Sequence, residues 1–165
     1  MRAGARAAVT PPPAQVVGEA EPLTERSLSF LVRSSHRAFV AVLAGALTPH
    51  GITVAEWAVL RILWQQEGLT QVALAARMQV GKASLTPVLN GLERKGILSR
   101  KRTEGDRRKH ALSLTRLGRD LEAGLLPIGA AINQRARSGI EDDEMEMAAR
   151  VLERVIGNLR LEDGQ

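Results

Sequence analysis

The stretch that decides the fold is residues 70–96, which read TQVALAARMQVGKASLTPVLNGLERKG. Apolar residues recur at helical spacing in two runs, so we predict helices over residues 71–78 and 82–95. Thr70 is a suitable N-cap for the first helix, and Gly96 is a suitable C-terminal stop for the second. A short glycine-containing turn joins them, and this arrangement predicts a helix-turn-helix.

The apolar residues of these two helices define the faces that we expect to be buried. In the first helix they are Val72, Leu74, Ala75 and Met78, and in the second they are Leu85, Val88, Leu89 and Leu92. After Gly96 the period changes, and residues 97–102 and 110–114 are predicted to be two short strands. The polar stretch 103–109 between them contains glycine and aspartate, so we expect it to be the hairpin tip.

Two helices are predicted before the helix-turn-helix. The first covers residues 25–47, with Thr24 as its cap and an apolar stripe along its length. The second covers residues 54–66 and begins at a capping box formed by Thr53 and Glu56. Its apolar side chains occupy more than one side, so we expect it to be central and buried.

Two more helices are predicted after the strands. Thr115 caps a long one that runs to about residue 138, and we expect it to bend near Pro127. The last covers residues 141–160, with acidic residues in its first turn, where the helix dipole favours them. The first helix and the last two are too apolar to be left exposed, which predicts pairing with a second copy of the chain.

Positive charge is concentrated in residues 82–109. This segment holds nine basic and three acidic residues, a net charge of +6, against +5 for the whole chain, whose isoelectric point is about 10.6. It has no aromatic residue, whereas readers of RNA and single strands usually stack bases on aromatic rings. The pattern predicts a double-stranded DNA partner, with a helix for the major groove and an arginine-bearing tip for the minor groove.

Composition argues against several other classes. The chain has no cysteine, which rules out disulfides, thiolate zinc sites and thiol redox sensors. Its three histidines are scattered, so we expect no metal site and no cofactor. We expect neither a membrane span nor a signal peptide, and therefore a cytoplasmic protein.

The most specific motif is DRRKHALSLT, residues 106–115, followed by Gly118. It resembles the wing signature of the MarR family (multiple antibiotic resistance regulators), in which Asp-x-Arg precedes Leu-x-Leu-Thr. Three further stretches are similar to the family's second helix and helix-turn-helix: residues 53–60, 74–80 and 89–96. Each stretch alone is moderately specific, and their order along the chain strengthens the resemblance.

The pattern and the resemblance together predict a mainly α fold with a small two-stranded β wing, that is, a winged helix-turn-helix with N- and C-terminal dimerisation helices. The expected domains are a flexible N-terminal tail (1–23), a helix for dimerisation and the ligand cleft (24–50), the DNA-binding domain (51–115) and C-terminal dimerisation helices (116–165). The resemblance implies a homodimer on a pseudo-palindromic operator, acting as a repressor that a small molecule releases.

Residue roles follow from matching positions in the resemblance. Arg108 matches the wing arginine that enters the minor groove, Asp106 matches the acid that holds it, and Arg100 matches a second basic contact. Arg107 adds charge at the same tip. The outer face of the predicted recognition helix carries Lys82, Ser84, Thr86 and Asn90. We expect substitution of Thr86 to alter base preference, and substitution of Arg100 to weaken all sequences alike.

Residues 84–87, SLTP, most resemble the hydroperoxide-sensing branch of the family. That branch senses with a cysteine, and this chain has none. The sensing mechanism of that branch therefore does not carry over to this chain.

A ligand cleft is hypothesised at the first two helices. Phe30, Arg33, His36 and Trp57 would give it an aromatic and cationic lining. Such a lining suits an aromatic carboxylate or its thioester. The alternative is that the aromatic residues here are ordinary core.

Two other functions were weighed against regulation. An enzyme needs a convergent nucleophile, base or metal set, and the sequence offers none, so we do not expect catalysis. A constitutive or architectural DNA-binding protein without an effector would show weak sequence preference and a salt-dominated affinity.

Overall fold

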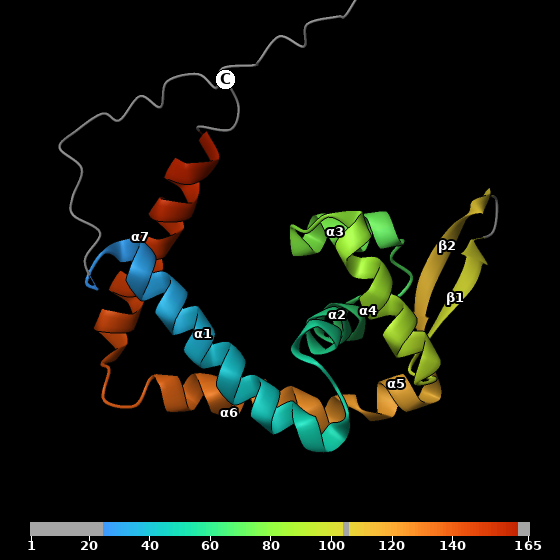
Figure 1. The fold of residues 1–165 in the computed structure, drawn as a ribbon, viewed down its shortest axis with the longest axis horizontal. Coiled ribbons are helices and arrows are strands. Elements are labelled where there is room, and N and C mark those ends of the chain that lie inside the picture. Colours follow the sequence, from blue (N-terminus) through green and yellow to red (C-terminus); the bar gives the residue numbers. More distant parts are fainter. Residues whose placement is uncertain (1–24, 104–105, 162–165) are drawn as a thin grey trace, which may run out of the picture. The chain divides into compact units, whose positions relative to one another are not determined.

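The computed structural model describes the backbone of residues 25–103 and 106–161 and the side chains of residues 25–101 and 111–160. Most of the described chain is helical, and it also contains a two-stranded antiparallel sheet (Figure 1). This confirms the predicted fold class, mainly α with a small two-stranded β wing.

Helix α1 spans Leu28–Leu47, and a turn of 3₁₀ helix, η1 (Thr48–His50), follows it. The predicted start at residue 25 was three residues too early. The Ser27 carbonyl accepts the first helical hydrogen bond, from Leu31 N at 3.0 Å, so the helix begins after Ser27. The chain divides within α1 into two compact units. The first unit ends at residue 37 and the second begins at residue 38.

The segment Leu28–His50 is long and apolar enough to cross a membrane by length and composition. The expectation that no segment would reach this length was therefore wrong. The charged residues of α1 lie in its first half, which leaves a long apolar run after them. A core helix of a soluble protein and a signal sequence pass the same test, so this finding gives weak support to a membrane span.

Helix α2 spans Val54–Gln65 and begins at the predicted capping box. Thr53 Oγ1 accepts a bond from Glu56 N at 3.2 Å, and Glu56 Oε2 accepts one from Thr53 N at 2.8 Å. These bonds satisfy amide groups that the first helical turn leaves free. As predicted, α2 is a central helix, and its buried residues are Glu56, Trp57, Val59, Leu60 and Leu63.

The predicted helix-turn-helix is α3 (Gln71–Met78) and α4 (Lys82–Arg94). Thr70 caps α3 through its side chain, as expected. Gln79 ends α3 in the left-handed region at φ 56°, and Gly96 follows α4 at φ 67°. Both positive angles turn the chain sharply, and only Gly96 adopts its angle without the strain of a Cβ atom.

Helix α3 buries fewer residues than predicted. Leu74 and Ala75 are buried and Met78 is half-buried, but Val72 is 61% exposed. The assignment of Val72 to the inner face was wrong. At 3.6 residues per turn, Val72 points away from the side that the other three residues share.

Strands β1 (Leu98–Thr103) and β2 (Asp106–Leu114) form the wing. Their antiparallel register pairs Leu98 with Leu114, Arg100 with Leu112 and Arg102 with His110. The predicted start of β2 at residue 110 was four residues late, so the predicted tip over 103–109 was too long. Residues 106–109 are all polar, so the sequence has no alternation of apolar and polar residues there to reveal a strand.

The loop before α3 is joined to the wing. Gly68 N donates to Leu112 O at 2.9 Å, and Leu112 N donates to Leu69 O at 2.8 Å. Thr70 forms an isolated antiparallel bridge with Ala111. The wing is therefore attached to the helix-turn-helix by backbone hydrogen bonds, which residue periodicity could not predict.

The C-terminal part consists of α5 (Arg116–Asp120), α6 (Glu122–Ala136) and α7 (Asp142–Leu161). The prediction of one uninterrupted helix was wrong, because the helix is interrupted at Leu121, while α6 continues through Pro127. Leu121 keeps right-handed helical angles (φ −69°, ψ −21°), so the interruption is local. Leu121 N still donates to Leu117 O at 3.2 Å, four residues back as in a regular α-helix, and Leu125 N donates to Leu121 O at 3.0 Å.

The core of the second unit lies among α2, α3, α4 and the base of the wing. Its largest fully buried side chains are Leu47, Val59, Leu60, Leu63, Leu74, Leu89, Leu92, Leu112 and Leu125. Helix α7 differs, because it leaves large apolar side chains exposed: Met147, Val151, Leu152, Ile156 and Leu159. Large exposed apolar patches of this kind are typical of interaction surfaces.

Candidate nucleic-acid interface

Helix α4 divides into a buried face and an exposed face. Leu85, Leu89 and Leu92 are buried in the core. We name the opposite side the recognition face, and it consists of Lys82, Ser84, Thr86 and Asn90, all exposed as predicted. Lys82, Thr86 and Asn90 are spaced by four residues, so they lie one above another along the helix.

Gln71 connects the first turn of α3 to the recognition face. Its side-chain Nε2 lies 3.0 Å from Thr86 Oγ1 and 3.1 Å from the carbonyl oxygen of Lys82. The two bonds fix how α4 sits on α3 and also fix the rotamer of Thr86. Sequence periodicity did not single out Gln71, because it is a polar residue in a first turn.

Arg100 on β1 reaches the other end of the recognition face. Its Nη2 donates to Asn90 Oδ1 at 3.0 Å and lies 3.5 Å from Glu93 Oε2. The guanidinium therefore joins the wing to α4 through one amide and one carboxylate. The predicted DNA contact Arg100 thus has a partner within the protein, which the sequence did not reveal.

The base of the wing is held by polar contacts from three elements. Thr115 Oγ1 donates to Gly96 O at 2.6 Å and accepts from Gly118 N at 3.1 Å, which confirms it as a helix cap. Glu67 accepts from Leu114 N at 3.2 Å and pairs with an Arg119 side-chain nitrogen at 3.0 Å. These contacts fix the angle at which the hairpin leaves the domain.

An ion pair supports the recognition helix from behind. Lys95 Nζ lies 2.6 Å and 2.7 Å from the two carboxylate oxygens of Glu56, and it also donates to Gly51 O at 2.8 Å. Burial alone would raise the pKa of Glu56, but the bonds from Lys95 and Thr53 outweigh it and lower that pKa. A Cβ on Gly91 would lie 2.8 Å from the carboxylate, so glycine makes room for it.

The wing tip carries the remaining predicted contacts. Asp106, Arg107 and Arg108 belong to β2 by their backbone. Their side chains lie outside the described residues. Their predicted roles in the minor groove therefore remain predictions.

The predicted ligand residues fall into two groups. Phe30, Arg33 and His36 are exposed on α1 in the first unit, and Trp57 belongs to the second unit. Trp57 is only 8% exposed, and its ring is so close to α6 that a Cβ on Gly129 would lie 2.8 Å away. For Trp57 the packing agrees with the alternative that it is a core residue.

Both tryptophans of the chain join α2 to the C-terminal helices. Trp57 Nε1 donates to Leu125 O at 3.4 Å, and Trp64 Nε1 donates to Gly118 O at 2.9 Å. Each bond ends on a backbone carbonyl, so it depends on where the helix runs rather than on a particular side chain. The junction of α5 and α6 is thereby tied to the centre of the domain.

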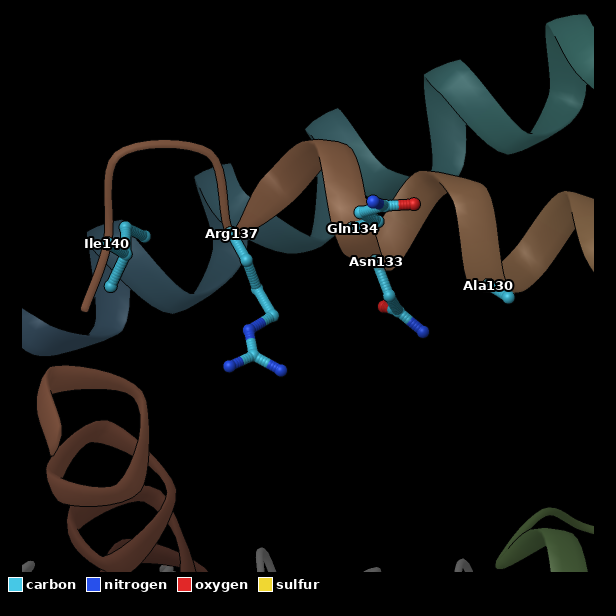
Figure 2. A pocket seen from close by; sticks show the side chains of 5 residues that line it. All are labelled: Ala130, Asn133, Gln134, Arg137 and Ile140. Carbon is cyan, nitrogen blue, oxygen red and sulfur yellow. The ribbon is translucent and has the colours of Figure 1, made fainter. Parts of the chain in front are cut away.

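Two surface hollows are lined by residues outside the recognition face. One follows α6 and the turn after it, and Figure 2 shows Asn133 and Arg137 projecting from the same side of that helix. Another lies beside Arg61, whose Cζ is 4.9 Å from the Trp57 ring centroid. Among the described residues no group of three histidine or acidic side chains is arranged to hold a metal ion.

Comparison with known proteins identifies the family. A profile of the MarR family matches residues 52–110, which cover α2, the helix-turn-helix and most of the wing. The chain is 30% identical, over 118 residues, to the organic hydroperoxide resistance transcriptional regulator of Bacillus subtilis (strain 168), covering 72% of this chain and 80% of the relative. The stretch SLTP resembles the hydroperoxide-sensing branch of the family, and this relative is named for organic hydroperoxide resistance.

Solved structures share the fold. CouR from Rhodococcus jostii RHA1, bound to p-coumaroyl-CoA, matches with a TM-score of 0.70 at 25% identity, over 79% of this chain and 92% of that chain. Bordetella bronchiseptica BpsR, whose DNA binding is regulated by 6-hydroxynicotinic acid, matches with a TM-score of 0.75 at 22% identity, over 82% and 97%. The resemblance read from the wing motif is confirmed, and this chain belongs to the MarR family of transcriptional regulators.

Proposed function

We propose that this regulator is a cytoplasmic homodimer that represses transcription by binding a pseudo-palindromic double-stranded DNA operator, and that a small molecule releases it. The observation that carries DNA binding is the recognition face of α4. Three of its side chains form one polar row on a helix whose opposite face is locked into the core. A helix of this kind can enter a major groove without losing its support.

The charge distribution supports the same function. The segment over residues 82–109 carries more net positive charge than the whole chain, and it comprises α4 and most of the wing. Phosphate neutralisation by such a segment supplies affinity for any duplex, while the recognition face supplies preference. In this proposal Lys82, Ser84, Thr86 and Asn90 contact base edges, and Asp106, Arg107 and Arg108 act at the adjacent minor groove.

The effector class is proposed from two relatives and from α1. CouR binds p-coumaroyl-CoA, and 6-hydroxynicotinic acid regulates BpsR. Both compounds join an aromatic ring to a carboxyl or acyl group. We propose an effector of that class, with Phe30, Arg33 and His36 as exposed residues available to it and Trp57 as a further candidate.

The test is a titration of a labelled duplex from upstream of the protein's own gene, in the presence of excess unrelated duplex. A complex that survives the competitor and dissociates with an aromatic acid supports the proposal. Equal competition by any duplex would instead favour the constitutive, architectural alternative, whose affinity depends mainly on salt.

Arg108→Ala is expected to lower operator affinity by about 1–3 kcal/mol, because an arginine in a narrow minor groove meets concentrated negative potential. Fluorescence anisotropy at fixed salt measures the change. Arg154→Ala, which removes the same charge from an exposed position on α7, is the matched control and should bind as the unaltered protein does. An unchanged dissociation constant for Arg108→Ala would refute the wing assignment.

Light scattering at micromolar concentration is expected to give the mass of a dimer. The exposed apolar residues of α7 need burial, and a second copy of the chain offers the same face. Two copies then present two recognition helices about one helical turn of DNA apart. A monomer mass at this concentration would contradict the proposed dimer.

A further inference from the structure

We infer that the recognition face presents almost only hydrogen-bond donors to the major groove, and therefore selects guanine in each half-site. This inference rests on the proposed function and adds the class of base that α4 reads. It starts from two contacts within the protein, those of Gln71 with Thr86 and of Arg100 with Asn90.

The contact of Gln71 decides how Thr86 can act. The carbonyl oxygen of Lys82 can only accept, so the group of Gln71 that faces it must be the amide nitrogen. The same nitrogen lies 3.0 Å from Thr86 Oγ1, which therefore serves as an acceptor. The single hydroxyl proton of Thr86 is left to donate to a group outside the protein.

The contact of Arg100 decides how Asn90 can act. A guanidinium only donates, so the atom of Asn90 that faces it at 3.0 Å must be the amide oxygen. Glu93, with its carboxylate 3.5 Å from Arg100, helps to hold the guanidinium in this position. The amide NH₂ of Asn90 remains available and offers two donors.

The polar row thus offers one kind of hydrogen-bonding group. Lys82 contributes an ammonium, Thr86 a hydroxyl proton and Asn90 an amide NH₂, all of them donors. Ser84, beside this row, is the one member of the recognition face whose hydroxyl keeps both roles. The oxygens of Thr86 and Asn90 each already accept one bond from a donor of the protein, which directs them towards Gln71 and Arg100.

Base edges differ in how they meet such a row. Guanine presents two acceptors in the major groove, N7 and O6, whereas thymine presents one, O4, and adenine and cytosine each present an amino donor. An asparagine usually reads adenine by accepting from its amino group and donating to N7. The bond with Arg100 turns the amide oxygen of Asn90 towards the wing. The NH₂ group is then the part of Asn90 left to meet a base, and it matches the acceptors of guanine.

The first experiment uses the unaltered full-length protein. Selection from a randomised duplex library is expected to return guanine in each half-site under α4. Replacing that guanine by 7-deazaguanine removes N7 and should weaken binding about tenfold, as expected for half of a specific base contact. Hypoxanthine keeps N7 and O6 and loses only the minor-groove amino group, so it is the matched control and should bind normally.

The second experiment frees the Asn90 oxygen. Arg100→Met should shift the preference at one position of the half-site from guanine towards adenine by about tenfold, because Asn90 can then both accept and donate. Lys101→Met removes the same charge from an exposed neighbour on β1 and should weaken all sequences alike. If Arg100→Met instead weakens binding to all sequences alike, as the sequence led us to expect, the inference is overturned.

The outcomes separate this inference from the proposed function. Specific binding to half-sites without guanine under α4, or normal binding to the 7-deazaguanine duplex, overturns the inference and leaves DNA regulation intact. Failure to bind any duplex with sequence preference overturns the proposed function and the inference with it.

Discussion

Gly118→Ala is expected to lower the free energy of unfolding by about 3 kcal/mol, at the upper end of the usual cost of overpacking. A Cβ at Gly118 would lie 2.3 Å from the carbonyl oxygen of Ile97 and 3.2 Å from a Leu114 methyl group. The first of these atoms is backbone at the base of the wing, so a side-chain rotation cannot relieve the contact. The wing or α5 must move, and urea denaturation measures the cost.

Gly124→Ala is the matched control for this substitution. A Cβ at Gly124, in α6, meets no atom within 4 Å. Alanine in a helix is favoured over glycine, so this variant should be stabilised by about 0.5–1 kcal/mol. Equal urea midpoints for Gly118→Ala and the unaltered protein would show that α5 and the wing base are not in such close contact.

Lys95→Met is expected to lower the free energy of unfolding by about 3 kcal/mol at neutral pH, because it leaves the buried Glu56 carboxylate without its cation. The figure is at the low end for a broken buried pair, since the Lys95 side chain is 37% exposed while that of Glu56 is 6% exposed. Lys101→Met, on the exposed surface of β1, should change stability little. The double variant Glu56→Gln with Lys95→Met tests the assignment, because it should recover part of the loss.

The same pair predicts how the loss varies with pH. The pKa of Glu56 is lowered in the folded protein, so the pair stabilises the fold above the unfolded value of about 4.3. This contribution disappears as the pH falls through the folded pKa. The stability difference between the unaltered protein and Lys95→Met should therefore be largest at neutral pH. It should shrink as the pH falls below the unfolded pKa of about 4.3. A difference that stays constant to acid pH would contradict the role given to Glu56.

Most of the fold could be predicted from the sequence, because the starts of several helices depend on residues that are close together in the chain. Thr53 with Glu56, Thr70 and Thr115 each bond an amide within their own first turn, so a short stretch of sequence contains the whole interaction. The apolar faces of α2 and α4 were likewise visible at helical spacing. Two of the errors, at the polar start of β2 and at the interruption at Leu121, fell where no local signal exists.

The outer face of the recognition helix was predicted as a set of exposed residues, and Lys82, Ser84, Thr86 and Asn90 are exposed in the structure. What the sequence could not reveal is which of these residues are already bonded within the protein. Gln71 and Thr86 are 15 residues apart, and Arg100 and Asn90 are 10 apart. Such pairs depend on how α3 and β1 pack beside α4, and packing is a property of the folded chain.

The bonds from Trp57 and Trp64 to the α5–α6 junction make tryptophan fluorescence sensitive to that junction. The chain has two tryptophans and no tyrosine, so its intrinsic fluorescence arises from α2 alone. Each indole N–H is bonded to a carbonyl of the C-terminal helices, at Leu125 and Gly118. Any movement of those helices relative to α2 alters the surroundings of both rings. Emission from the unlabelled protein therefore reports whether a ligand or a DNA duplex shifts this junction.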